Sequence, residues 1–260
     1  MGNELLDRKI RMVADMIVNA DKVVVFTGAG VSTESGIPDF RGPDGLWTKV
    51  DPDDFTIGSF LRSAEIRRRM WSFLLEGGLF TDAKPNKAHY AIAELEKVGK
   101  LSCVITQNVD DLHQKAGNSP ETVYELHGNT RRAKCLGCGE CYPMEEIRQK
   151  LSAKVDICPC ERCQGILKPD AVFFGEALPE ETLINATDHS RNCDILIVIG
   201  SSLVVYPAAY MPMYAKMAGA KLVIINNAPT PYDSAADIII NDSAGEVMAR
   251  IMGEVKKRIN

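Results

Sequence analysis

Polar side chains follow a short apolar segment near the middle of the chain, in the order Thr106-Gln107-Asn108-Val109-Asp110-Asp111-Leu112-His113. Open α/β sheets bind their ligands at the carboxyl ends of the strands, so a polar cluster in this position predicts a binding site. Asn108 and Asp110 have groups that can hold a carboxamide or a ribose hydroxyl. Asp111 and His113 suit the capping and solvation of a following helix.

A histidine follows the next short apolar segment, in Glu125-Leu126-His127-Gly128. The neighbouring glycine leaves the imidazole open to close approach. A lone histidine in such a place is more often structural than catalytic, so the local pattern leaves both roles open.

Six of the eight cysteines fall between residues 135 and 163. In a chain without secretory features this density favours a metal over disulfides. Two CxxC pairs with 21 residues between them have the spacing of a zinc ribbon: Cys135, Cys138, Cys160 and Cys163. Four thiolates fill a tetrahedral site, so the metal is expected to be structural. Cys141 and Cys158 remain alternative ligands, and a disulfide or redox role is a further alternative.

A glycine-rich turn, Gly28-Ala29-Gly30-Val31-Ser32, follows directly on an apolar segment. Backbone amides in such a turn can face a pyrophosphate. The dinucleotide fingerprint of dehydrogenases needs a third glycine where this chain has Thr33, and an acidic residue that ends a second strand about 20 residues later. No such strand is indicated there. The turn therefore predicts a nucleotide site without hydride-transfer architecture, with a purely structural turn as the alternative.

The segment after the turn, residues 34–42, is long and rich in helix-breaking residues. Long loops at this place in a fold usually carry function. Phe40 has the size to shield a reactive intermediate from water, and Arg41 can bind phosphate or carboxylate oxygens with two hydrogen bonds. The alternative is a packing phenylalanine and a surface arginine.

Length and charge narrow the classes of function. The 260 residues, 45% of them hydrophobic, suffice for one core with a small appended module. A net charge of −5 without a long basic run disfavours nucleic acid as a partner. Residues 4–20 are predicted to form an amphipathic helix rather than a signal peptide, and no apolar run approaches the roughly 20 residues of a membrane span. We expect a soluble cytoplasmic protein, monomeric and without a membrane partner.

Short segments rich in β-branched residues recur between helical segments, at residues 23–26, 103–106, 195–199, 222–225 and 238–240. Segments that are apolar on both faces belong to parallel sheets covered by helices on each side. The sequence therefore predicts a doubly wound, mostly parallel, Rossmann-like α/β sheet. A last helix is predicted after Ser243, which forms a capping box with Glu246.

The segment between His127 and Phe173 departs from this alternation. It is rich in cysteine, glycine, proline and charged residues, with one helical stretch at residues 143–151. It is predicted to be a small zinc-ribbon module inserted into the larger fold. We expect a single catalytic domain at residues 1–260, with a large nucleotide-binding lobe at residues 1–130 and 170–260 and the small module at residues 131–169.

Several of these segments resemble the sirtuins, a family of NAD-dependent protein-lysine deacylases. The similar segments follow the family's order and cover essentially the whole chain: GAGVSTESGIPDFRGPDGLW at 28–47, TQNVDDLH at 106–113, ELHGN at 125–129, the two CxxC pairs, KPDAVFFGEALP at 168–179, GSSLVVYPAA at 200–209, IIN at 224–226 and AGEV at 244–247. The resemblance implies removal of acetyl groups from protein lysine side chains, with release of nicotinamide and O-acetyl-ADP-ribose. It also favours Cys135, Cys138, Cys160 and Cys163 as the ligands of one structural Zn²⁺.

By the same resemblance, NAD is consumed as a co-substrate, and His127 deprotonates one of its ribose hydroxyls. An imidazole suits this role because its ordinary pKa lies near the operating pH. Asn108 and Asp110 are implied to orient the nicotinamide side and a water molecule. The residues implied to bind NAD are Gly28, Ala29, Gly30, Ser32, Asp39, Phe40, Arg41, Trp47, Gln107, Asn108, Asp110, Gly200, Ser201, Ser202, Asn226, Asn227 and Ala244.

Substrate peptides of this family pair through their main chain with two protein segments, which permits many sequences around the acetyl-lysine. The corresponding residues here are Val172, Phe173, Phe174 and Gly175 in the first segment and Val204, Val205 and Tyr206 in the second. Phe173 is expected to line the tunnel for the lysine stem. Members that prefer acidic acyl chains share a Tyr-x-x-Arg pair, and no tyrosine falls between Trp47 and Tyr90. Acetyl-lysine is therefore the expected substrate, with longer fatty acyl chains as an alternative and poor turnover of succinyl- or malonyl-lysine.

Three other functions remain open at this point. Mono-ADP-ribosyl transfer uses the same NAD site and cleaves the same bond. A non-enzymatic zinc-ribbon binding module could keep a regulatory or vestigial NAD site, although His127 argues against it. An NAD-dependent oxidoreductase is disfavoured by Thr33 and by the missing acidic residue.

Overall fold

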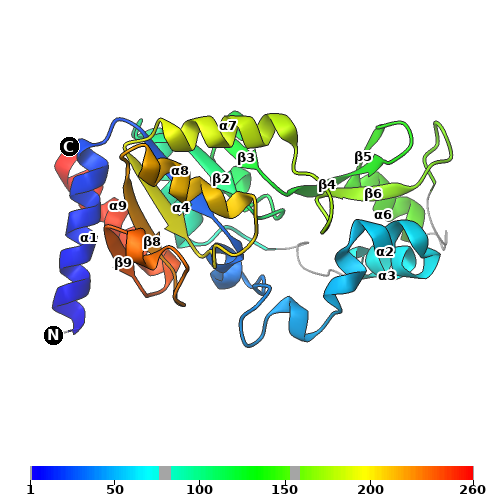
Figure 1. The fold of residues 1–260 in the computed structure, drawn as a ribbon, viewed down its shortest axis with the longest axis horizontal. Helices are drawn as coiled ribbons and strands as arrows, with labels where there is room; N and C mark the ends of the chain where they lie inside the picture. The colour runs from blue at the N-terminus through cyan, green and yellow to red at the C-terminus, as the bar shows by residue number, and fades with distance from the viewer. Residues whose placement is uncertain (1, 76–82, 153–158, 260) are drawn as a thin grey trace.

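The larger part of the molecule is a parallel sheet of six strands between two layers of helices (Figure 1). The computed structural model describes residues 2–75, 83–152 and 159–259. The strand order is β3-β2-β1-β7-β8-β9, and the bounds are Val123–Glu125 for β3, Leu101–Thr106 for β2, Val23–Thr27 for β1, Ile195–Ile199 for β7, Lys221–Ile225 for β8 and Ile238–Ile240 for β9. The five predicted strands are confirmed. β3 is missing from the prediction, because three residues that end in Glu125 give no periodic signal.

Alternate residues of the central strands face opposite helical layers. In β1, Val23 and Val25 pack beneath α1 (Gly2–Asn19), α4 (Lys87–Lys97) and α9 (Ala244–Ile259). Val24 and Phe26 face the other side, where α7 (Glu180–Arg191) and α8 (Met211–Met217) cover the sheet. All four side chains are fully buried, as expected for strands that are apolar on both faces. The predicted doubly wound sheet is thereby confirmed.

The chain crosses from one side of β1 to the other, since β1 lies between β2 and β7. Such a switch point leaves a crevice beyond the carboxyl ends of the two strands, where open α/β sheets bind ligands. In this molecule β1 ends at Thr27 beside Ile199 of β7, so the switch point lies at the residues that follow these two. The glycine-rich turn and the segment at residues 200–209 are therefore neighbours.

A second, antiparallel sheet forms the small lobe, at the end of the molecule remote from α1 (Figure 1). Its order is β5-β4-β6, with bounds Cys141–Pro143, Gly128–Cys135 and Leu167–Ala171. The helix predicted at residues 143–151 is α6 (Met144–Ser152). Two helices from earlier in the chain, α2 (Ile57–Arg62) and α3 (Ala64–Leu75), lie beside this sheet. Trp71 of α3 joins its apolar cluster, so residues outside 131–169 help to build the small lobe.

The capping box predicted for α9 is wrong. The Ser243 hydroxyl donates to Glu34 Oε1 (2.9 Å), and the Gly245 N–H donates to the same oxygen (2.7 Å). Glu246 instead pairs with Lys87 on the surface. A carboxylate from a distant loop therefore caps this helix, and a local sequence pattern cannot reveal such a partner.

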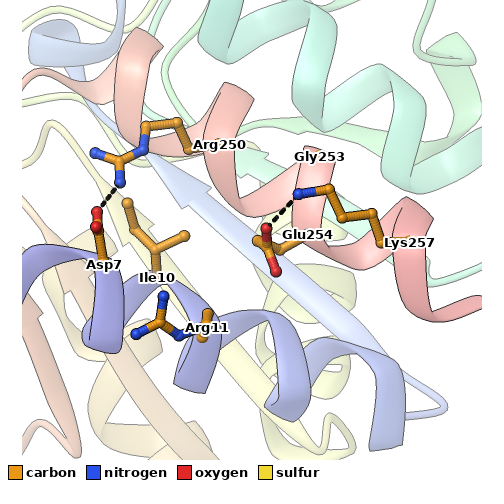
Figure 2. Close-up of a pocket in the computed structure, with 7 residues that line it drawn as sticks. All are labelled: Asp7, Ile10, Arg11, Arg250, Gly253, Glu254 and Lys257. Carbon is orange, nitrogen blue, oxygen red and sulfur yellow. Dashed lines mark hydrogen bonds and ion pairs between the residues drawn. The ribbon is translucent and has the colours of Figure 1, made fainter.

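A surface pocket of about 350 Å³ lies between α1 and α9 (Figure 2). Its charged side chains largely neutralise one another, since Arg250 pairs with Asp7 and Lys257 with Glu254. None of the candidate residues lines it, so it is not the candidate site. Among the residues that the structure describes, no helix is long and apolar enough to cross a membrane.

Candidate functional site

The carboxyl ends of β1 and β7 are joined through glycines. Gly28 donates its N–H to the oxygen of Ile199 (3.1 Å), and Gly30 donates to that of Gly200 (2.8 Å). A Cβ atom on Gly30 would lie 2.8 Å from Gly200, and one on Gly200, whose φ is 62°, would lie 2.2 Å from the Val31 nitrogen. The glycines are thus required where two main chains meet. Close packing of the two main chains is therefore a reason for these glycines that is separate from the clearance a bound pyrophosphate would need.

Three buried polar side chains converge beside this junction. The turn continues as the 3-10 helix η1 (Ala29–Ser35), in which the Ser32 hydroxyl donates to Asp110 Oδ2 (2.7 Å) and accepts from Asn108 Nδ2 (3.1 Å). Asp110 Oδ1 accepts the N–H of Leu112 (3.0 Å). Burial raises the pKa of Asp110, although the bonds from Leu112 and Ser32 oppose it. The structure therefore joins the glycine-rich turn to the polar cluster after β2.

The roles expected for Asp111 and His113 are wrong. Asp111 makes no side-chain cap to α5 (Leu112–Ala116) and binds Arg131 instead, while Asp110 accepts the first helical N–H. His113 is 2% exposed and hydrogen-bonded to the Thr27 hydroxyl (2.9 Å), so it does not solvate the helix. These roles were predicted wrongly because a helix of only five residues offers too few positions for its sequence to show which face is buried.

His127 follows β3 and is held in one tautomer. Its Nδ1 atom lies 2.9 Å from the main-chain oxygen of Gln107, and an oxygen of this kind can only accept. The proton therefore sits on Nδ1, and Nε2 keeps the lone pair that a general base needs. Burial lowers the pKa of His127, and the bond to Gln107 opposes that shift. A lowered pKa keeps the imidazole neutral at physiological pH.

Gln107 links the candidate base to the end of β7. Its main-chain N–H donates to the oxygen of Thr27 (2.9 Å), and its side-chain Nε2 donates to the Ser201 hydroxyl (2.7 Å). The hydroxyl oxygen of Ser201 also accepts the N–H of Leu203 (3.3 Å). Ser202, by contrast, is exposed. Hydrogen bonds thus connect residues from the ends of three strands, β1, β2 and β7.

The long loop after η1 presents a row of aromatic rings. Trp47 lies 5.2 Å from Phe40 and 6.0 Å from Phe174, measured between ring centroids. Asp39 stabilises the loop, because its carboxylate accepts the N–H of Gly42 (2.7 Å). Arg41 is exposed, and within the described part of the chain its guanidinium has no partner. The row connects the loop implied to bind NAD with the segment implied to bind the peptide.

Residues after β8 and before α9 lie further along the sheet edge. Asn226 donates its main-chain N–H to Ile240 (3.1 Å) and accepts from the side chain of Asn241 (2.8 Å). Asn227 is exposed. Ala244 stands between Ser243 and Gly245, the two residues that bind Glu34 of η1. The position of Ala244 is thus fixed relative to the glycine-rich turn.

The first of the two segments that were predicted to bind the peptide continues β6. Phe173 is buried against Phe60, with centroids 5.3 Å apart, and its N–H donates to Glu176 Oε2 (2.7 Å). Phe174 uses both main-chain groups within the chain, donating to Phe55 and accepting from Ile57 at 3.0 Å each. Only part of this segment therefore has main-chain groups left for a peptide.

The second segment follows β7 and exposes apolar side chains. Val204 is 44% exposed and Tyr206 is 52% exposed, whereas Val205 is half-buried. The oxygen of Val205 accepts the N–H of Ala209 (2.9 Å). Phe174 of the first segment is likewise 43% exposed, so both segments expose apolar side chains.

Four cysteines of the small lobe form a compact cluster. The Sγ atoms of Cys135, Cys138, Cys160 and Cys163 all lie within 4.8 Å of one another. Cys135 and Cys163 are 3.4 Å apart, and Cys138 and Cys160 are 3.6 Å apart. Cys141 is exposed, contacts the oxygen of Gly139 and stands outside the cluster, and Cys158 lies outside the described residues. Four soft donors at this spacing fit one tetrahedral zinc ion.

Several residues around the site have no counterpart in the sequence-based prediction, among them Glu34, Thr27, His89 and Asn86. A signal was available for three of them. Thr27 ends an otherwise apolar strand, and Asn86 begins a capping box with His89 before α4. Nothing in the sequence points from Glu34 to α9, which lies over 200 residues away.

Comparisons with known proteins agree with one another. Residues 28–207 match the sequence model of the Sir2 family. An NAD-dependent protein deacylase 2 of Archaeoglobus fulgidus is 46% identical over 97% of this chain and 98% of its own length. An NAD-dependent protein deacetylase 1 of Bradyrhizobium diazoefficiens is 46% identical over 94% and 95%. A solved structure of a Sir2 variant with a deacetylated p53 peptide and 3'-O-acetyl-ADP-ribose is 40% identical, covers 94% of this chain and 98% of its own, and superposes with a TM-score of 0.86.

Proposed function

The chain belongs to the Sir2 family and is an NAD-dependent protein-lysine deacetylase, and we propose that His127 is the general base of its reaction. The reaction removes acetyl groups from lysine side chains and releases nicotinamide and O-acetyl-ADP-ribose. NAD, when bound, would supply the ribose carbon that the amide oxygen of acetyl-lysine attacks as nicotinamide leaves. Residues of the chain would position the reactants and accept the proton of a ribose hydroxyl.

One observation carries the assignment of the base. The bond between His127 Nδ1 and the oxygen of Gln107 leaves Nε2 unprotonated in the neutral ring. A base must hold a lone pair at the operating pH, and the lowered pKa of His127 satisfies this condition. We therefore assign to Nε2 the removal of a proton from a ribose hydroxyl.

Asn108 and Asp110 are proposed to orient the nicotinamide side of NAD and a water molecule. Both side chains are buried and share Ser32 as a common partner, so neither can rotate freely. Preorganised groups of this kind contribute by holding reactants in place before the reaction. The remaining proposed NAD contacts are Gly28, Ala29, Gly30, Ser32, Asp39, Phe40, Arg41, Trp47, Gln107, Gly200, Ser201, Ser202, Asn226, Asn227 and Ala244.

The proposed substrates are acetyl-lysine proteins and peptides. Residues Val172–Gly175 and Val204–Tyr206 are assigned to main-chain pairing, and Phe173 to the tunnel for the lysine stem. The buried ring of Phe173 against Phe60 supports the second assignment. We further propose that the enzyme is a cytoplasmic monomer and has no direct nucleic-acid partner.

The four cysteines are proposed to hold one structural zinc ion. Four thiolates complete the coordination, so the metal supplies folding free energy rather than a reactive water. We propose a small module of residues 131–169 and a large NAD-binding lobe of residues 1–130 and 170–260. Cys135, one of the four proposed ligands, ends β4, and the same strand begins at Gly128, next to His127.

The test is mass spectrometry of an acetyl-lysine peptide with and without NAD, following peptide mass and nicotinamide together. Loss of one acetyl group per nicotinamide released is expected in the wild type. His127→Ala should lower turnover by roughly 10² to 10⁴. His189→Ala, which changes a matched histidine whose ring binds Ser102 and Tyr124, should not. Full activity of His127→Ala would refute the assignment of the base.

A further inference from the structure

Two buried histidines face each other beneath the proposed NAD site. His89 of α4 is 0% exposed and His113 of α5 is 2% exposed, and their ring centroids are 5.0 Å apart. Each ring has one nitrogen with a hydrogen bond and one without. Within the described part of the chain, the nitrogens without a partner are Nε2 of His89 and Nδ1 of His113. Buried polar atoms without partners are rare and costly, so this pair requires an explanation.

The bonded nitrogens fix the tautomer of each ring. The main-chain N–H of Asn86 donates to Nδ1 of His89 (3.3 Å), so the proton of His89 sits on Nε2. The Thr27 hydroxyl donates to Thr106 Oγ1 (2.8 Å) and has only acceptor capacity left for Nε2 of His113 (2.9 Å). The proton of His113 therefore also sits on Nε2. Both rings are neutral, because burial lowers the pKa of His89 to about 4 and that of His113 well below its usual value.

These tautomers make the two unpartnered atoms complementary. His89 presents an N–H donor, and His113 presents a lone pair. A proton on Nδ1 of His113 would instead leave both unpartnered nitrogens as donors, with no acceptor between the two rings. The pairing of donor with acceptor therefore follows from the outer bonds of the two rings.

The chain of bonds continues to a proposed catalytic residue. Thr106 Oγ1, which accepts from Thr27, also accepts the main-chain N–H of Asn108 (3.0 Å). At the other end, the side chain of Asn86 donates to the main-chain oxygen of Val31 in η1 (2.8 Å). The first turn of α4 thus contacts both loops that are proposed to bind NAD.

Since neither nitrogen has a direct partner, we infer that one water molecule accepts from Nε2 of His89 and donates to Nδ1 of His113, and that the two histidines are positioning residues for Asn108. The first turn of α4 then fixes the position of the glycine-rich turn through Asn86 and the position of the polar cluster through His89. The role of Asn108 rests on the proposed function. The water-mediated link between the two rings does not depend on that function.

Two amide substitutions at His89 distinguish a link to His113 from a role that is limited to capping α4. His89→Gln places an N–H donor near the position of Nε2 but gives up the acceptor at Nδ1. His89→Asn keeps an acceptor near Nδ1, and with it the cap, but removes the donor. The inference predicts that His89→Asn raises the KM for NAD roughly tenfold, with His89→Gln within about threefold of the wild type. Near-normal KM in His89→Asn together with a raised KM in His89→Gln would overturn it.

Histidine ring spectra by ¹⁵N NMR test the tautomers without any catalytic assay. Both His89 and His113 should carry their proton on Nε2 and should not titrate between about pH 5 and pH 8. A proton on Nδ1 of His113 would make this nitrogen a donor instead of an acceptor, and it would refute the inference. If the wild type consumed no NAD, the proposed function would fail while these spectra still decided the water-mediated link. His189→Asn serves as the control, and its KM for NAD should match that of the wild type.

Discussion

The main-chain oxygen of Gln107, 2.9 Å from Nδ1 of His127, determines which nitrogen of that ring is the base. The same residue sends its side chain to Ser201 at the end of β7. The tautomer of the proposed base is therefore set by a residue that also joins two strands of the sheet.

The pH dependence of kcat/KM should report the pKa of His127. His127 must be neutral to act, and its pKa lies below the ordinary value of 6.5 because the ring is buried. The acidic limb of the profile is therefore expected below pH 6.5, with full activity above it. In His127→Ala, kcat/KM should fall by roughly 10² to 10⁴. An acidic limb centred above pH 6.5 would contradict the lowered pKa.

Acid should destabilise the protein through His89. Its pKa is lowered in the folded state, so the neutral ring stabilises the fold above pH 6.5, and this contribution is lost as pH falls toward about 4. The shift from 6.5 to about 4 corresponds to about 3 kcal/mol. The unfolding free energy, measured by urea titration at several pH values, should depend less on pH in His89→Gln. An unchanged pH dependence would argue against a buried neutral ring.

Removal of the metal should unfold the small lobe before the large one. Cys160→Ala deletes one of four clustered thiolates and is expected to abolish zinc retention and activity together. Cys141→Ala is the matched control, since this exposed thiol stands outside the cluster. Zinc content by atomic emission and the thermal unfolding curve provide the measurements. Equal zinc loss in both variants would show that the ligand set is different.

A side chain at residue 200 should disturb the contact between the glycine-rich turn and the end of β7. Gly200→Ala adds a Cβ that would lie 2.2 Å from the Val31 nitrogen, on a backbone with positive φ. Gly219→Ala is a control with positive φ, 95°, but open space around its Cβ. The control isolates backbone strain, which costs roughly 1 kcal/mol. Gly200→Ala should lose more stability than Gly219→Ala and raise the KM for NAD, and equal effects would exclude the clash as the cause.

The acyl preference can be tested with one peptide carrying different groups. Acetyl-lysine should be turned over efficiently and succinyl-lysine poorly, because the region between Trp47 and Tyr90 contains no tyrosine to bind an acidic chain. Initial rates with matched peptides measure the ratio. Faster desuccinylation than deacetylation would refute the expected preference.

Local patterns predicted much of the fold. The five predicted strands follow from short apolar segments, because a segment buried on both faces must be apolar throughout. The first helix follows from the helical spacing of its apolar residues, and α6 from the proline that precedes it. The predicted capping box of α9 failed for the opposite reason. Glu34, which caps that helix, lies over 200 residues away in the chain, and only folding brings it there.

The sequence by itself determined which residues stand at strand ends, and through their types it determined the chemistry open to this protein: thiolates for a metal, and amides, carboxylates and an imidazole for NAD. The tertiary structure alone decided how these groups meet. It selected four cysteines and left Cys141 outside. It also placed the proton on Nδ1 of His127 and buried His113 against His89. The physical reason is that a tautomer or a ligand set depends on contacts across the chain, and these contacts exist only once the strands and helices have packed.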